Sequence, residues 1–291
     1  MRILFLTVFL IILSACSENN RVPVIGGGYG IGESINDRRE GLWTFYRDND
    51  SILSQGVYKN DKAEGEWKFY HLNGQLEEVS FWTDDKVNGE INVYHDNGNS
   101  YYSGAYEMDK RVGNWTWYRR DGQKEMEGTF VDDKEEGEWM WWYTDGQLKE
   151  ITHFHDSLKQ GVSVTYHENG QMKSQGKYTF NLQDGTWVLY YNNGVVEDST
   201  EWVSGSVNGY SVYYYPNGLK KFEGTYLKNM ENGKQQWYYD NGQKQLEGTY
   251  ENGLENGKFT FYTINGEVNN VMNYIKGVKL EDQTELEDQT E

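Results

Sequence analysis

Large apolar side chains alternate with polar ones along most of this chain. In many segments two aromatic residues stand two positions apart, as Trp67 and Phe69 or Trp115 and Trp117 do. Successive side chains of a strand point to opposite faces of a sheet, so a spacing of two places both rings of such a pair on one face. Aromatic and β-branched residues also suit pleated strands. The pattern therefore predicts β-strands throughout the repeating part of the chain.

Glycine divides these strands into repeats of equal length. One glycine, the opening glycine, recurs every 24 residues, at Gly41, Gly65, Gly89, Gly113, Gly137, Gly161, Gly185, Gly209, Gly233 and Gly257. Nine residues later a second glycine, the turn glycine, follows Asn or Asp in every repeat except the first. Asn-Gly and Asp-Gly tolerate the positive φ angles of a type I′ turn and are the strongest short signal for a hairpin. Each repeat is expected to be strand, turn, strand and polar connection.

Ten such repeats predict an all-β fold, an elongated antiparallel β-meander over residues 41–276. A β-propeller is one alternative, but its blades repeat every ~40–45 residues. A parallel β-helix could use a 24-residue coil, yet it would not need ten tight reversing turns. Sheets this wide seldom stay flat and open, so we expect the meander to curl.

A column of small residues stands fifteen positions after the opening glycine. We expect a small side chain there to leave room for a large ring from the paired strand. The column is Gly56, Ser80, Gly104, Gly128, Thr152, Gly176, Thr200, Gly224 and Gly248.

The amino terminus has the features of a secretory signal. Arg2 precedes a short apolar run, Ile3 to Leu13, which is too short to span a bilayer, since spanning takes ~20 apolar residues. The following Ser14-Ala15-Cys16 resembles a bacterial lipobox, which implies cleavage before Cys16 and lipid attachment to that cysteine. Residues 1–15 are therefore expected to be a signal peptide and Cys16 the membrane anchor. Ser17 favours the outer membrane if the cell has two membranes.

Two segments outside the repeats are expected to lack structure. Residues 16–40 contain a glycine-rich stretch, Gly26 to Gly32, whose spacing does not fit a phosphate-binding loop. We interpret this segment as a flexible tether. Residues 277–291 include a duplicated acidic hexapeptide that cannot bury a core, so an acidic disordered tail is predicted.

The repeat unit resembles the MORN-repeat variant found in bacterial proteins. Gly65-Glu-Trp67-Lys-Phe-Tyr70 with Asn73-Gly74-Gln75 is a good instance, and Glu247-Gly248-Thr-Tyr250 matches its end. The likeness covers Gly41 to Lys276, and it departs where Ser163, Ser211 and Gln235 replace the tryptophan. The resemblance implies a scaffold or lipid-proximal module. Some members carry an antitoxin label, which implies neutralisation of another protein.

Composition limits the chemistry of the chain. Its formal net charge of −19 argues against a nucleic-acid partner, which needs a basic surface. His71, His95 and His167 share one column, but even His71 and His95 of neighbouring repeats would lie two strands apart, too far to share a metal. Paired carboxylates such as Asp132 and Asp133 fall in connections, where water should surround them. We therefore predict no enzyme activity, no metal site and no cofactor.

Exposed aromatic rows are the best candidate for a binding surface. Trp115, Trp117, Trp139 and Trp141 would form adjacent pairs in neighbouring repeats, and exposed apolar patches tend to mark such surfaces. The same rings could instead pack within the sheet or its curl. Two functions remain open: a lipid-anchored envelope scaffold or neutralising partner that binds a protein, which we favour, and a lipoprotein that binds a cell-wall or surface glycan.

Overall fold

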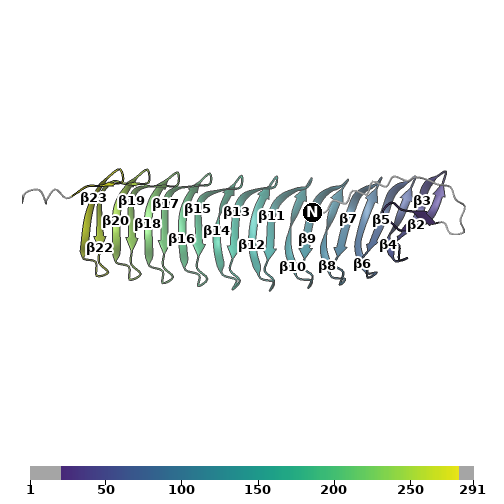
Figure 1. Ribbon diagram of the computed structural model, residues 1–291, viewed down its shortest axis with the longest axis horizontal. Helices are drawn as coiled ribbons and strands as arrows, with labels where there is room; N and C mark the ends of the chain where they lie inside the picture. Colours follow the sequence, from purple (N-terminus) through teal and green to yellow (C-terminus); the bar gives the residue numbers. More distant parts are fainter. Residues whose placement is uncertain (1–20, 282–291) are drawn as a thin grey trace, which may run out of the picture. The chain divides into compact units, whose positions relative to one another are not determined.

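The computed structural model describes residues 21–281 and contains strands throughout this range (Figure 1). The chain divides into two compact units, Met1–Gly146 and Gln147–Glu291. The first unit contains β1 (Arg21–Pro23), β2 (Tyr29–Ile35), β3 (Arg38–Tyr46), β4 (Ile52–Lys59), β5 (Lys62–Tyr70), β6 (Leu76–Thr83), β7 (Lys86–Tyr94), β8 (Ser100–Glu107), β9 (Lys110–Tyr118), β10 (Lys124–Val131) and β11 (Lys134–Trp142).

The second unit continues the alternation of long strands and short turns. It contains β12 (Leu148–His155), β13 (Leu158–Tyr166), β14 (Met172–Thr179), β15 (Leu182–Tyr190), β16 (Val196–Val203), β17 (Ser206–Tyr214), β18 (Lys220–Leu227), β19 (Met230–Tyr238), β20 (Lys244–Glu251), β21 (Leu254–Glu255), β22 (Gly257–Tyr262), β23 (Val268–Ile275) and β24 (Val278–Lys279). Residues 21–281 contain no helix long and apolar enough to cross a membrane.

Within each unit, strands that follow one another in the chain pair antiparallel. In the first unit β5 pairs with β4 on one side and with β6 on the other. In the second unit β17 pairs in the same way with β16 and β18. Every hairpin thus lies beside the next one, as Figure 1 shows within each unit. The predicted all-β meander of hairpin repeats is confirmed.

The Asn-Gly turns differ from the predicted type. His71 N–H donates to Gln75 O and Gly74 N–H donates to His71 O, at 2.8 and 2.9 Å. Gly74 has φ +82°, whereas Asn73 is not among the residues with positive φ. This geometry is a type I turn followed by a left-handed glycine, a three-residue hairpin loop. The prediction of a type I′ turn here was wrong, because only one residue adopts the left-handed conformation.

Type I′ turns occur at the opposite ends of the strands, between one repeat and the next. Asp84 and Asp85 both have positive φ, +52° and +67°, which defines this turn type. The predicted polar connection from Asp84 to Gly89 is therefore mostly strand, since β7 already begins at Lys86. Asp and Asn tolerate the left-handed region better than other non-glycine residues, which explains the acidic composition of these turns.

The opening glycines lie at bulges inside the strands. Ser80 pairs with Ile91 and Trp82 pairs with Val87, so three residues of β7 face the single residue Phe81. Gly89, in the middle of these three, has φ +127°. A bulge of this kind adds residues to one strand and increases its twist. The 24-residue spacing of the opening glycines thus marks one bulge in each repeat.

The structure extends the repeat pattern towards the amino terminus. β2 pairs with β3, and Gly32 lies opposite Trp43. Asn36 and Asp37 form another pair of positive-φ residues, as the turn residues between later repeats do. The part of the predicted tether from 21 to 40 is therefore a partial repeat, and the predicted boundary at residue 41 has to move. Cys16 and the predicted signal peptide lie outside the described residues, as does the tail from 282 onward.

The small-residue column makes room for aromatic rings, as the sequence suggests. A Cβ atom added to Gly128 would stand 2.1 Å from the Trp139 ring, and one added to Gly176 would stand 2.1 Å from the Trp187 ring. Such distances leave no space for any side chain. Where a tryptophan stands two residues after an opening glycine, its ring thus lies flat on the glycine of the preceding strand and is buried there.

Candidate binding surface

The four candidate tryptophans lie close together on one face of the first unit. The ring centroids of Trp115 and Trp117 are 5.7 Å apart, and those of Trp139 and Trp141 are 6.1 Å apart. Phe130 stands edge-on between Trp115 and Trp139, at 6.0 and 5.0 Å. The structure therefore brings all four residues into one aromatic cluster.

Burial differs within this cluster. Trp115 and Trp139 are only 2% and 3% exposed, whereas Trp117 and Trp141 are half-buried. The first two rings belong to the core, because they cover the glycines of the preceding strands. A partner could reach Trp117 and Trp141 more readily, so the candidate surface narrows to these two. Its binding role stays a prediction.

The histidine column has a structural role at the Asn-Gly ends of the hairpins. The ring Nε2–H of His71 donates to Tyr94 O at 2.9 Å, and His95 and His167 make the same bond to the next repeat. Arginine or tyrosine occupies this column in all other repeats except the last, which has Thr263. Several of them donate to the equivalent carbonyl, as Tyr191 does to Tyr214 O at 2.7 Å. These side chains join neighbouring repeats.

The carboxylates in the type I′ turns join neighbouring repeats at the opposite ends of the strands from the Asn-Gly turns. Asp85 Oδ1 accepts a hydrogen bond from Ala63 N–H at 2.7 Å, and Asp85 N–H donates to Ala63 O at 3.2 Å. The sequence interpretation placed such groups in water, yet their conformations are fixed by hydrogen bonds. Residues 21–281 contain no group of three or more His, Cys, Asp or Glu side chains arranged to hold a metal ion.

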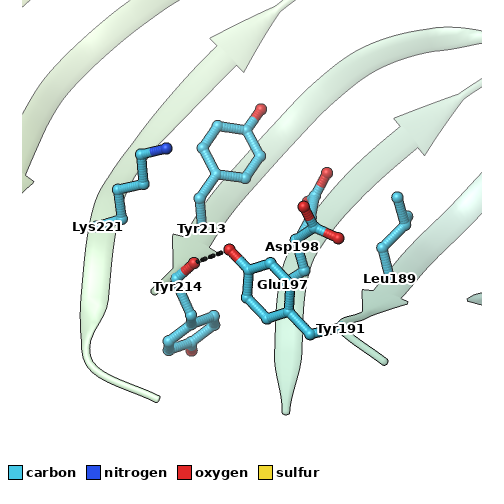
Figure 2. A pocket seen from close by; sticks show the side chains of 7 residues that line it. All are labelled: Leu189, Tyr191, Glu197, Asp198, Tyr213, Tyr214 and Lys221. Carbon is cyan, nitrogen blue, oxygen red and sulfur yellow. Dashed lines mark hydrogen bonds between the residues drawn. The ribbon is translucent and has the colours of Figure 1, made fainter. Parts of the chain in front are cut away.

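A hollow of about 320 Å³ lies on the second unit, a feature that the sequence interpretation missed (Figure 2). The residues that line it come from the ends of β15 and β17, the start of β16 and β18, and the turn after β15. They are Leu189, Tyr191, Glu197, Asp198, Tyr213, Tyr214 and Lys221. Three tyrosine rings and two carboxylates thus border one concave surface.

The hollow lies where the tryptophan column is interrupted. Asp198 pairs with Tyr213, and Thr200 pairs with Ser211, which stands in the tryptophan position. In the first unit the corresponding Trp115 stacks at 5.8 Å on Tyr102, the counterpart of Asp198. With serine at 211, no indole ring covers the Asp198 side chain. The hollow lies beside this position and is lined by Leu189 and Tyr213, whereas Ser211 itself is fully buried.

Hydroxyl groups orient the carboxylate that borders this hollow. Ser211 Oγ–H donates to Thr200 Oγ1 at 2.9 Å, and Thr200 Oγ1–H donates to Asp198 Oδ1 at 2.6 Å. Burial raises the pKa of Asp198 above its ordinary value, since desolvation disfavours the charged form. No histidine lines the hollow, so the arrangement offers a fixed acid but no histidine base beside it.

The opposite face of the second unit has a polar network. Glu247 Oε2 accepts from Lys244 Nζ at 2.8 Å and Glu247 Oε1 accepts from Tyr262 O–H at 2.7 Å. These hydrogen bonds lower the pKa of Glu247 to about 2. Its carboxylate is therefore satisfied within the sheet and stabilises neighbouring repeats.

The comparisons with known proteins agree with the repeat architecture. Five segments match the MORN repeat variant: residues 39–60, 63–84, 135–156, 159–179 and 231–252. A comparison with curated proteins found no match.

Solved structures give only remote similarity. The crystal structures of TcdB2-TccC3 and of TcdB2-TccC3-Cdc42 each match with 12% identity and a TM-score of 0.19. Each match covers 89% of this chain, and the chain spans 17% of the length of that protein. A Photorhabdus luminescens Tc holotoxin pore matches with 11% identity and a TM-score of 0.17, over 89% of this chain and 17% of that one. Similarity this low says nothing about function. The five matched segments are thus similar to the MORN repeat variant, and each of them forms a hairpin of the sheet.

Proposed function

We propose that this protein is a non-enzymatic interaction scaffold that is attached to the bacterial cell envelope by a lipid on Cys16 and binds a partner protein. The observation that carries the proposal is a column of half-buried rings four residues after the opening glycine. It includes Trp117 and Trp141 in the first unit and Tyr213 and Trp237 in the second. Extended repeat sheets commonly bind proteins through such surfaces. A neutralising, antitoxin-like or immunity-like role is one form that this binding could take.

A cross-linked pull-down of the tagged protein from its native envelope tests the proposal. We expect one stoichiometric protein partner, identified by mass spectrometry. Changing the half-buried Trp117 and Trp141 to alanine should reduce its recovery, while the exposed Leu72, 78% exposed at a turn, serves as a matched alanine control. Recovery of no protein partner would contradict the proposal.

Lipid attachment has its own test. Replacing Cys16 with serine removes the thiol that would receive the lipid, so we expect the variant to leave the membrane fraction. Burial of acyl methylenes contributes about 0.8 kcal/mol each, which makes a chain with several acyl groups a durable anchor. Fractionation followed by immunoblotting measures the effect. A variant that still sediments with membranes would exclude Cys16 as the anchor.

A glycan ligand is the second candidate function. Tyrosine rings beside carboxylates, as at Tyr213 and Asp198, suit a sugar, whose apolar face stacks on a ring while its hydroxyls bind oxygen acceptors. In the pull-down, retention of cell-wall or surface polysaccharide without a protein would support this function.

A further inference from the structure

An acidic side chain stands thirteen positions after the opening glycine in three repeats, whereas the other repeats have Ser, Tyr, Met, Phe, Leu or Asn there. Each time, serine or threonine replaces the glycine two residues later, and the tryptophan of the next repeat is lost. The three sets are Glu78, Ser80 and Ile91; Glu150, Thr152 and Ser163; and Asp198, Thr200 and Ser211. Within each set, the acid and the serine or threonine lie on one strand, and the residue in the tryptophan position lies opposite the serine or threonine on the next strand. The three replacements of a set are therefore neighbours in the sheet.

In the second set, the chain places its own cation beside the acid. Lys159 Nζ lies 3.6 Å from Glu150 Oε1 and 5.2 Å from the centroid of the Tyr178 ring. The ammonium group therefore has a carboxylate on one side and the face of a tyrosine near it. Both attract a cation, the first by charge and the second by the ring quadrupole. Ser163, in place of tryptophan, leaves room for this lysine.

The third set has the acid and the rings but not the lysine. Val207 stands at the position that corresponds to Lys159, two residues before the opening glycine. Asp198 accepts a hydrogen bond from the Thr200 hydroxyl, and within residues 21–281 it forms no ion pair. Lys221, on the rim, instead lies 5.8 Å from the centroid of the Tyr215 ring. The space beside Asp198 is the hollow of Figure 2.

The first set explains why a hollow does not follow from the acid alone. Ile91 stands in the tryptophan position beside Ser80 and is only 4% exposed. A large apolar side chain thus fills the tryptophan position of the first set, where the third set has the smaller Ser211. Among these three sets, only the one with Asp198 combines an acid, a small residue in the tryptophan position and no lysine at the position of Lys159.

We propose that the hollow at Asp198 binds a cationic side chain, lysine or arginine, of a basic partner protein. This inference rests on the proposed protein-binding function and names the chemistry of the partner. The Asp198 carboxylate accepts the charge-assisted hydrogen bond, Glu197 adds a second negative charge, and the Tyr213 ring lies against the cation. The net charge of −19 attracts a basic protein from solution and disfavours an acidic one.

The test uses the full chain labelled with 3-fluorotyrosine, and the probe is the peptide acetyl-Gly-Arg-Gly-amide. We expect the fluorine resonance of Tyr213, assigned with Tyr213→Phe, to shift saturably at about 0.15 M salt. The matching citrulline peptide, which has the same shape without the charge, should give no shift. Asp198→Asn should weaken arginine-peptide binding about ten-fold or more, because a charged hydrogen bond is lost.

Three further variants control the result. Glu150→Gln alters the acid that Lys159 already neutralises, so binding at Tyr213 should stay unchanged. Val207→Lys supplies an internal lysine and should abolish the arginine response while the Thr200 and Ser211 hydroxyls stay in place. Lys159→Val copies the third set, so the Tyr178 resonance should begin to respond to the probe.

Equal shifts with the arginine and citrulline peptides would overturn the proposal, as would unchanged binding by a folded Asp198→Asn variant. A response to N-acetylglucosamine oligomers but not to the arginine peptide would also overturn it and favour a glycan. The pull-down distinguishes failure of the cation site from failure of the scaffold function. A partner protein whose recovery does not depend on Asp198 leaves the scaffold function standing without this site, whereas the absence of any partner removes the scaffold function itself.

Discussion

Replacing Gly176 with threonine is expected to lower the free energy of unfolding by about 3 kcal/mol, at the upper end of what overpacking a protein core costs. The new Cβ would stand 2.1 Å from the Trp187 ring. That ring has little freedom to move, because it is 5% exposed and its Nε1–H donates to Lys177 O at 3.1 Å. Chemical denaturation of the variant and of the parent chain measures the difference.

A second substitution tests whether the clash is the cause. Adding Trp187→Ser recreates the pair that the chain already uses at Thr152 and Ser163, whose hydroxyls form a buried hydrogen bond of 2.7 Å. We expect the double variant to be destabilised by about 2 kcal/mol less than the sum of the two single variants, since the two residues are in direct contact. The control is Lys177→Thr on the exposed face of the same strand, which should change stability by no more than about 0.5 kcal/mol. A stable Gly176→Thr single variant would show that the ring does not lie on the glycine.

Replacing Trp115 with alanine is expected to cost about 3–5 kcal/mol, as large-to-small changes of buried tryptophans do. Trp115 is 2% exposed, and its ring lies 5.1 Å from Tyr106 and 5.8 Å from Tyr102 by ring centroids. Its Nε1–H also donates to Val112 O at 3.2 Å. The loss of packing leaves a cavity in the first unit. Thermal unfolding followed by tyrosine and tryptophan fluorescence measures the resulting loss of stability.

Trp117→Ala is the matched comparison, because this ring belongs to the same cluster but is only half-buried. Its substitution should cost clearly less, since less apolar surface returns to water. The two variants separate structure from binding. Loss of a partner in Trp115→Ala would reflect damage to the sheet, whereas loss in a stable Trp117→Ala would locate a contact. Equal destabilisation by both substitutions would contradict the burial difference.

Sequence periodicity was sufficient to predict the repeat length and the strands, but the turn type predicted at the Asn-Gly sites was wrong. Asn-Gly is compatible with more than one hairpin loop, and the choice depends on how the two strands pair. At Asn73 and Gly74 the loop closes around a single left-handed residue. The Asn73 amide also donates to Asp96 O at 2.6 Å. The asparagine therefore joins adjacent hairpins, a role that a local turn preference does not reveal.

Two other features had signals in the sequence. Gly32 stands 24 residues before Gly56, and Asn36 stands 24 residues before Asn60, which marks the partial repeat at the amino terminus. The acids Glu78, Glu150 and Asp198 change together with their neighbours, which marks the three altered repeats. The first signal involves neither the opening glycine nor the tryptophan, and the second links the loss of a tryptophan to an acid and a hydroxyl residue in the preceding strand.

The sequence by itself determined the hairpin repeats and the packing of small residues against rings of the paired strand, because a 24-residue period with two-residue alternation permits only one consistent set of neighbouring strands. It could not determine which rings are exposed. Trp115 and Trp117 follow the same alternation and face the same side, yet only the first is covered, since its position over Gly104 depends on the bulge at Gly113 in its own strand. The hollow likewise required the tertiary structure. Three altered repeats share one sequence pattern but differ in what lies near each acid. The buried Ile91 fills the tryptophan position in the first, Lys159 pairs with Glu150 in the second, and a hollow borders Asp198 in the third.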